Sequence, residues 1–96
     1  MKNQVLTKVD KYSLSSVSFA KDEVLSSLDA IQSRAERLKR GLALGNLHKQ
    51  GTKLRFQNAA GELMETEGSI WAVTEQDVIF KKHIGVPIKS IFEVLL

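Results

Sequence analysis

The residues best suited to chemistry in this sequence are arginines and lysines gathered in its middle. Residues 34–55 carry seven basic side chains and one acidic one, a net charge of +6. Arginines three residues apart lie on neighbouring faces of a helix, and basic residues two apart share one face of a strand. Both arrangements can follow a phosphate backbone. The candidate contacts for nucleic acid, and for RNA in particular, are Arg34, Arg37, Arg40, Lys49, Lys53 and Arg55.

The mode of such binding is limited by the aromatic residues. The phenylalanines that could stack on bases are expected in the core, because their neighbours alternate with polar residues; they are Phe19, Phe56, Phe80 and Phe92. Attraction to the phosphate backbone is therefore the predicted mode, rather than recognition of bases. The alternative is that the basic residues only solvate the outer face of a helix and a strand.

An acidic block follows the basic one. Residues 62–77 carry five acidic side chains and no basic one. Adjacent blocks of opposite charge favour a polarised surface, either for an anionic ligand or for head-to-tail contact between copies. The simpler interpretation is that the acidic residues are solvated strand charges that discourage aggregation.

The patterns of catalysis and of metal or cofactor binding are missing from the sequence. It has no cysteine, which excludes thiolate zinc sites and cysteine nucleophiles. Neither His48 nor His83 has a carboxylate at a spacing that would complete a metal site. No serine stands in a nucleophile-elbow pattern, and the glycines do not form a phosphate-binding loop. We therefore expect no enzymatic activity, no metal and no cofactor.

Residues 19–44 are predicted to form a long amphipathic helix. Apolar residues recur there at intervals of four, three, four, three and four, the heptad spacing of a helix that pairs with another helix. Ser18 is expected to cap the start, and the helix ends at Gly41 or at Gly45. At full length it would extend beyond a small sheet. The predicted self-association seam, for a second copy or a partner helix, consists of Val24, Leu28, Ile31, Ala35, Leu38 and Leu42.

Residues 52–96 have the alternation and turn signals of short β-strands. The run from Leu63 to Val73 changes its alternation near Gly68, which predicts a bulge or a sharp bend. Lys89-Ser90 predicts a single helical turn before the last strand. Five strands this short bury an apolar face by curling, so we expect a small, strongly bent, antiparallel β-barrel. Together with the helix it makes one α+β domain.

Three motifs near the end of the chain resemble the small-barrel superfamily that includes Sm-like RNA-binding proteins: Val78-Ile79-Phe80, Val86-Pro87-Ile88 and Lys89-Ser90-Ile91. The resemblance implies rings or small assemblies, and RNA as a ligand. His83, after two lysines, is the nearest match to a nucleotide pocket of that superfamily. The stretch from Ser69 to Glu75 is also similar to part of a short, uncharacterised bacterial protein family, which implies no function.

Two further parts of the chain complete the expectations. Residues 1–18 mix apolar residues with serines and predict a loosely docked or disordered arm. Trp71 is expected to pack beneath the helix, with an exposed anchor for a partner as the alternative. No segment reaches the length of about 20 apolar residues that a membrane span needs, and the start lacks the apolar run of a secretory signal.

These observations predict a cytoplasmic, non-catalytic binding module of unknown ligand. Self-association or protein interaction through the helix is the first expectation, because the heptad pattern is cleaner than the basic patch. RNA binding through residues 34–55 is the alternative.

Overall fold

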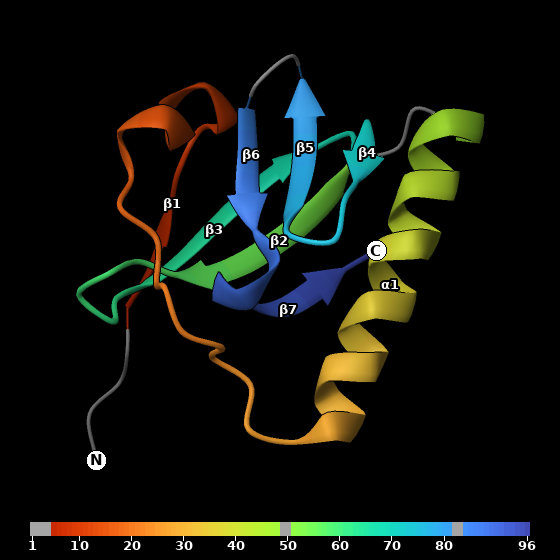
Figure 1. Cartoon of the computed structure of the whole chain (residues 1–96). Coiled ribbons are helices and arrows are strands. Elements are labelled where there is room, and N and C mark those ends of the chain that lie inside the picture. The colour runs from red at the N-terminus through yellow and green to blue at the C-terminus, as the bar shows by residue number, and fades with distance from the viewer. Residues whose placement is uncertain (1–4, 49–50, 82–83) are drawn as a thin grey trace.

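The computed structural model describes residues 5–48, 51–81 and 84–96 of the 96-residue chain. Over these residues the chain forms one α-helix and two β-sheets, which is an α+β arrangement (Figure 1). In chain order the elements, with 3-10 helices written η, are β1 (Leu6–Lys8), η1 (Lys11–Ser16), α1 (Leu28–His48), β2 (Thr52–Gln57), β3 (Leu63–Gly68), β4 (Ala72–Val73), β5 (Asp77–Lys81), β6 (Ile84–Pro87), η2 (Ile88–Ser90) and β7 (Ile91–Leu95).

The larger sheet has four strands in the order β1-β3-β2-β7. β2 and β3 form an antiparallel hairpin, and Asn58 closes its turn. The Oδ1 atom of Asn58 accepts hydrogen bonds from the backbone N–H groups of Ala60 and Glu62, at 3.1 and 2.8 Å. Gly61 in this turn has a φ of +82°, which residues with a side chain rarely adopt. β1 lies parallel to β3, and β7 lies antiparallel to β2 with a bulge.

The smaller sheet has three antiparallel strands in the order β4-β5-β6, and the chain enters it directly from β3. β3 ends at Gly68, and the backbone N–H of Trp71 already donates to the carbonyl of Ile79 in β5 at 2.8 Å. A Cβ atom at Gly68 would lie 3.0 Å from Cδ1 of Phe80, so a side chain here would press into the core. The predicted bend at Gly68 is confirmed, and it divides the expected second strand into β3 and β4.

The core lies where the two sheets and the inner side of α1 meet. Each sheet contributes phenylalanine to it, because Phe56 of β2 and Phe80 of β5 are fully buried. Phe19 packs against the cluster, its ring centroid 5.2 Å from that of Phe56, whereas Phe92 is only half-buried. The buried apolar residues are Leu14, Leu38, Leu54, Phe56, Ile70, Val78, Phe80, Val86, Ile91 and Val94.

The strands of the described residues form two separate sheets rather than one closed five-stranded barrel. The predicted helical turn at Lys89-Ser90 is confirmed as η2. One additional strand, β1, comes from a part of the chain that was expected to carry none. The α+β class is confirmed, and the closed barrel is not part of the observed hydrogen-bonded strand order.

Residues 5–18 differ from the predicted loose arm. β1 pairs with β3, and the backbone N–H of Val9 donates to the carbonyl of Glu65 at 2.7 Å. η1 then places Leu14 in the core with 2% of its surface exposed. The prediction was wrong because a three-residue strand and one apolar residue among serines produce no periodic pattern.

The helix begins at Leu28 rather than near residue 19, and it continues to His48. Ser27 is its N-cap, since its Oγ atom accepts a hydrogen bond from the backbone N–H of Ala30 at 3.1 Å. The residues before it, 17–27, form an extended strap along the lower edge of the molecule in Figure 1. The strap is held by tertiary hydrogen bonds, for example from the Val24 N–H to the Lys89 carbonyl at 3.0 Å.

Two glycines lie inside α1 instead of ending it. Gly41 and Gly45 are both buried. A Cβ atom at Gly41 would lie 3.0 Å from Oγ1 of Thr52 and 3.1 Å from Cδ1 of Ile70. Glycine therefore allows the helix to approach the sheets closely, and this contact offsets a helix-propensity cost of about 1 kcal/mol.

Candidate interaction surfaces

The six residues of the predicted self-association seam do not form one exposed stripe. Val24 lies in the strap, while Leu28 at the start of α1 is 77% exposed. Leu38 is 1% exposed and belongs to the core, and Leu42 packs against it. Of the other two, Ile31 is half-buried and Ala35 is exposed. Most apolar contact made by the seam therefore stabilises the single chain, contrary to the expectation of a helix-to-helix interface.

Arg34 explains why the buried side of α1 is rotated from the predicted seam. Its side chain is 6% exposed. Nη1 and Nη2 donate to the two carboxylate oxygens of Glu23, both at 2.6 Å, and Nη1 also donates to the carbonyl of Ile91 at 2.9 Å. The bidentate ion pair joins the strap to α1, and the hydrogen bond to Ile91 joins α1 to β7. Hydrogen bonding to Arg34 holds the pKa of Glu23 below its ordinary value. Arg34, a predicted phosphate contact, is thus committed inside the molecule.

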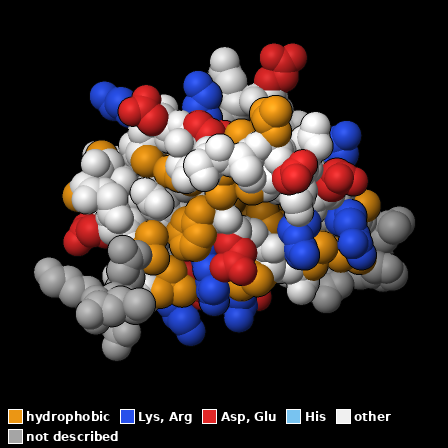
Figure 2. Space-filling view, turned by 90° about the horizontal axis from the view of Figure 1, so that it is seen from below, with side chains coloured by type: hydrophobic (Ala, Val, Ile, Leu, Met, Phe, Trp, Pro, Cys, Tyr) orange, Lys and Arg blue, Asp and Glu red, His pale blue; other side chains and the backbone are white. Residues whose placement is uncertain are grey.

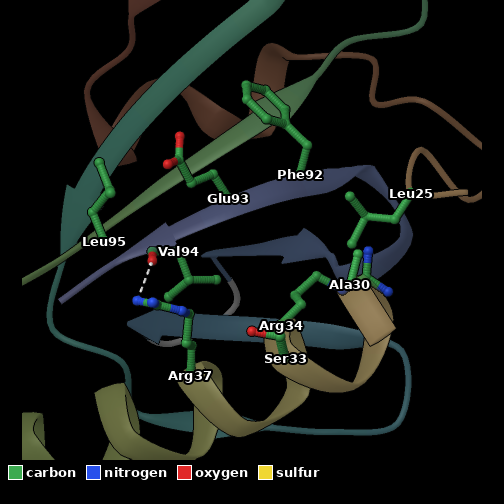
Figure 3. Close-up of a pocket in the computed structure, with 9 residues that line it drawn as sticks. All are labelled: Leu25, Ala30, Ser33, Arg34, Arg37, Phe92, Glu93, Val94 and Leu95. Atoms are coloured by element: carbon green, nitrogen blue, oxygen red, sulfur yellow. Dashed lines mark hydrogen bonds between the residues drawn. The ribbon is translucent and has the colours of Figure 1, made fainter. Parts of the chain in front are cut away.

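A groove of about 270 Å³ separates the first half of α1 from β7 (Figure 3). Within it, Nη1 of Arg37 lies 3.5 Å from the carbonyl oxygen of Val94, a long hydrogen bond. Figure 3 shows Val94 pointing toward the helix, whereas Phe92 and Glu93 point away from it. Arg34 and Arg37 thus cover carbonyl groups on the free edge of β7, which protects that edge from pairing with another strand.

The outer face of the four-stranded sheet carries a row of charges that crosses all four strands. Residues 53 and 55 point outward because the alternating Leu54 and Phe56 are buried. The strand register sets Lys8 of β1 beside Glu65 of β3, Glu65 beside Arg55 of β2, and Arg55 beside Glu93 of β7. We call this set the central charge row.

Arg55 is the centre of this row. Its Nε atom donates to Glu65 Oε1 at 2.9 Å, and its Nη1 atom donates to Glu93 Oε1 at 3.0 Å. A second row lies two residues along the strands, where Lys53 stands directly opposite Glu67. The strand part of the basic block therefore meets the acidic block on neighbouring strands of the same sheet.

These contacts change the electrostatics of the face. Glu65 is only 5% exposed, and hydrogen bonding to Arg55 holds its pKa below the ordinary value, with smaller effects of Lys53 and Lys8. The carboxylates in turn raise the pKa of Arg55, Glu65 most strongly. Figure 2, which views the whole molecule from below, shows blue and red side chains interspersed with hydrophobic ones. The outer face of the four-stranded sheet therefore carries mixed charges. It is not polarised, although the separate charge blocks of the sequence predict a polarised surface.

Three of the predicted phosphate contacts remain available. Arg37, Arg40 and Lys53 are exposed, and none forms an ion pair among the described residues. Arg37 reaches Val94, and Lys53 pairs across the sheet with Leu95, so both lie near the end of β7. Arg40 lies one helical turn beyond Arg37. Lys49 and His83 lie outside the described residues.

Trp71 is 57% exposed, so the expectation that it packs beneath the helix was wrong. Ile70, 1% exposed, occupies the buried position at this bend instead. Sequence reasoning also missed the roles of Lys8, Glu65 and Glu93. The signal for Glu65 was present, because the turn after residue 57 sets the hairpin register and brings it opposite Arg55.

No family model matches the chain, and neither a curated protein nor a solved structure matches it at a significant level. Across residues 5–48, 51–81 and 84–96, no group of three or more acidic or histidine side chains is placed to hold a metal ion. The same part of the chain contains no helix with the length and apolar character needed to cross a membrane.

Proposed function

We propose that this domain is a small, non-catalytic protein-interaction module that associates with a second copy of itself. The observation that carries the proposal is the outer face of the four-stranded sheet. The helix α1 contacts this sheet along β7, at its edge, and no helix among the described residues covers the outer side chains of β1, β3 and β2. A sheet of this kind buries its second face only by pairing with another molecule.

The composition of the face supports pairing between copies. It carries three positive and three negative side chains, so two copies do not repel each other: Lys8, Lys53, Arg55, Glu65, Glu67 and Glu93. Half-buried apolar side chains lie among these charges, namely Leu6, Leu63, Phe92 and Leu95. Their burial would contribute roughly 25 cal/mol for each Å² removed from water. Identical copies most often pair through one shared, self-complementary patch.

Sedimentation velocity of the full chain across a wide concentration range tests this function. We expect the weight-average mass to rise with concentration, and we expect Leu63→Glu to keep the protein monomeric because it places a new charge in the face. Gln32→Glu is the matched control, since residue 32 is exposed on α1. A wild-type protein that stays monomeric at the highest concentration would contradict the proposal.

We also infer that the two sheets are the halves of a small barrel of the Sm-like type. The support is the strand path: a hairpin from β2 to β3, a bend at Gly68 into β4, the turn η2 after β6, and the return of β7 to β2. An experimental structure with these strands in the order of an Sm-like domain would support the inference. A different strand order would overturn it.

RNA binding is a second candidate function, favoured by the exposed basic residues near the end of β7. Arg37, Arg40 and Lys53 could contact three phosphates, which predicts a slope of about −2 when log K for single-stranded RNA is plotted against log salt. We expect Arg37→Glu with Arg40→Glu to abolish binding in fluorescence anisotropy while the melting temperature stays nearly unchanged. Lys21→Glu, an exposed residue of the strap, is the charge-matched control. Unchanged RNA affinity in the double variant would remove this candidate.

A further inference from the structure

The charges on the outer sheet face are antisymmetric about the line between β3 and β2. Glu65 and Glu67 on β3 stand directly opposite Arg55 and Lys53 on β2. The pattern continues outward in the central charge row, with Lys8 on β1 and Glu93 on β7 at its two ends. The signs across the four strands therefore alternate as plus, minus, plus, minus. Rotation by 180° about that line brings every charge onto a position of opposite sign.

We propose that two copies of the domain pair face to face about a two-fold axis along the boundary between β3 and β2. This inference rests on the proposed self-association and specifies its geometry. β3 of one copy then lies over β2 of the other, and β1 lies over β7. Arg55 faces the partner's Glu65, Lys53 faces the partner's Glu67, and Lys8 faces the partner's Glu93.

The distances between packed sheets suit these contacts. Two sheets stack about 10 Å apart with their strands within about 30° of each other, and long side chains from both sides fill that gap. Arg55 already holds two carboxylates of its own chain, and because Glu65 is only 5% exposed, the other copy reaches this network through the exposed parts of Arg55 and Glu93. Networks that include arginine and carboxylate forks are stronger than isolated surface pairs.

The same charges exclude the other symmetric stacking. A two-fold axis across the strands would place β3 over β3 and β2 over β2. Glutamates would then face glutamates, and Arg55 and Lys53 would face the same basic strand of the partner. Like charges in direct opposition destabilise an interface. The charge pattern therefore selects the axis along the strands.

A second copy also suits the face better than a highly charged partner. The six charged side chains of the two rows sum to zero, so neither an anionic polymer nor a cationic one gains a net attraction. The pattern is complementary to itself, which no unrelated surface needs to be. The occupant of this face is therefore a second copy of the chain.

The size of the face predicts weak pairing. The four strands lie about 4.8 Å apart and have three, six, six and five residues, so at about 3.3 Å per residue they make a footprint of roughly 300 Å². Stable interfaces bury about 800 Å² of accessible surface per partner, so this dimer belongs to the weak and transient class. Its affinity should fall with added salt, because charge contacts at a solvent-accessible face are screened.

Mixing two charge-reversal variants tests the geometry directly. Lys53→Glu and Glu67→Lys alter exposed side chains, so both variants should fold. Alone, each places like charges opposite each other twice in the symmetric dimer and should weaken self-association about tenfold. In a mixture of the two, the new acidic side chain at position 53 of one copy faces the new basic side chain at position 67 of the other, and the unaltered Glu67 and Lys53 face each other. Sedimentation of the nuclease-treated mixture should therefore show more dimer than either variant shows alone at the same total concentration.

The outcomes separate this geometry from the function on which it rests. Lys39→Glu on the exposed side of α1 makes the same charge change outside the face and should dimerise like the wild type. A wild-type dimer that both variants leave unchanged, or a mixture that fails to pair, would overturn the two-fold geometry while self-association stands. A wild-type protein that never dimerises would overturn both.

Discussion

Two arginines of this domain each hold glutamate side chains, yet their surroundings are opposite. Arg34 is 6% exposed and enclosed by α1, the strap and β7, where it also donates to a backbone carbonyl. Arg55 is 34% exposed on an open sheet face, where it bridges two strands. The enclosed pair determines the path of the chain, because the strap reaches α1 through it. The open site leaves the exposed parts of Arg55 and Glu93 available to a second molecule, while the side chain of Glu65 is as enclosed as that of Arg34. Both arginines form ion pairs, so what distinguishes the structural arginine from the surface arginine is whether other elements of the chain cover it.

The largest effect should come from breaking the enclosed pair. Arg34→Ala leaves Glu23 and the Ile91 carbonyl without their donor. Removing one member of a buried pair costs about 3–5 kcal/mol, and because the Glu23 side chain is 27% exposed we expect about 2–4 kcal/mol in urea denaturation. Arg37→Ala, a neighbouring exposed arginine, should change stability by less than about 0.5 kcal/mol. Equal losses in the two variants would show that Arg34 is not enclosed in solution.

A smaller loss is expected from adding one methyl group to the enclosed side of α1. Gly41→Ala places a Cβ atom 3.0 Å from Oγ1 of Thr52, a residue that is 1% exposed and has little room to move. Overpacking costs about 1–3 kcal/mol and helix propensity returns about 1 kcal/mol, so we expect a net loss of about 1 kcal/mol. Gly51→Ala is the control, because the three atoms nearest to its Cβ would all belong to the flexible side chain of Glu67, the first at 3.3 Å. A stabilised Gly41→Ala protein in thermal denaturation would contradict the close packing.

Acid should affect both pairs, but salt should distinguish them. Glu23 and Glu65 have folded-state pKa values below the ordinary 4.5. Their contribution to stability is therefore complete above pH 4.5 and is lost as the pH falls through the lowered values. Denaturation curves at neutral and acidic pH should show that Glu23→Gln and Glu65→Gln each lose less free energy of unfolding on acidification than the wild type does. High salt should reduce the change in stability caused by Glu65→Gln more than the change caused by Glu23→Gln, because solvent reaches Arg55. An equal response to salt would remove the contrast between the two sites.

The smallest effect on stability should follow from Arg55→Gln. Glu65 is only 5% exposed, but the amide group of glutamine at position 55 can still donate to it, and Lys53 and Lys8 remain near it when the guanidinium is removed. We expect the melting temperature to stay close to that of the wild type while self-association weakens. A melting temperature lowered as far as in Arg34→Ala would mean that the open face also supports the fold.

The strands and the bend could be predicted from sequence because their signals are local. Alternation around Leu54 and Phe56, the slip at Gly68 and the turn at Lys89-Ser90 each depend on neighbouring residues. The inward direction of the Arg34 side chain could not be predicted from sequence, since its acceptors lie 11 and 57 residues away along the chain. An arginine at that spacing is ordinarily assigned to solvent, and this assignment rotated the predicted seam of α1.

The start of the helix was missed although part of its signal is local. Ser27 before Leu28-Asp29 has the form of an N-cap followed by an acidic first turn. Val24 has the spacing of a helical residue, but its backbone N–H donates to the carbonyl of Lys89, which is distant in the sequence. The surface pairs of the sheet, by contrast, follow from the hairpin register once the turn at Asn58 is placed.

The hairpin of β2 and β3 has a consequence for how fast the chain folds. Its strands are joined by a short turn with Gly61, so it can form within about 1–10 μs. The buried side of α1 meets β7 across 57 residues, and closing so long a loop is slower. We expect a transition state in which the hairpin is formed and the helix is still undocked. Substitutions in the turn at Asn58 should then slow refolding, whereas Arg34→Ala should mainly accelerate unfolding.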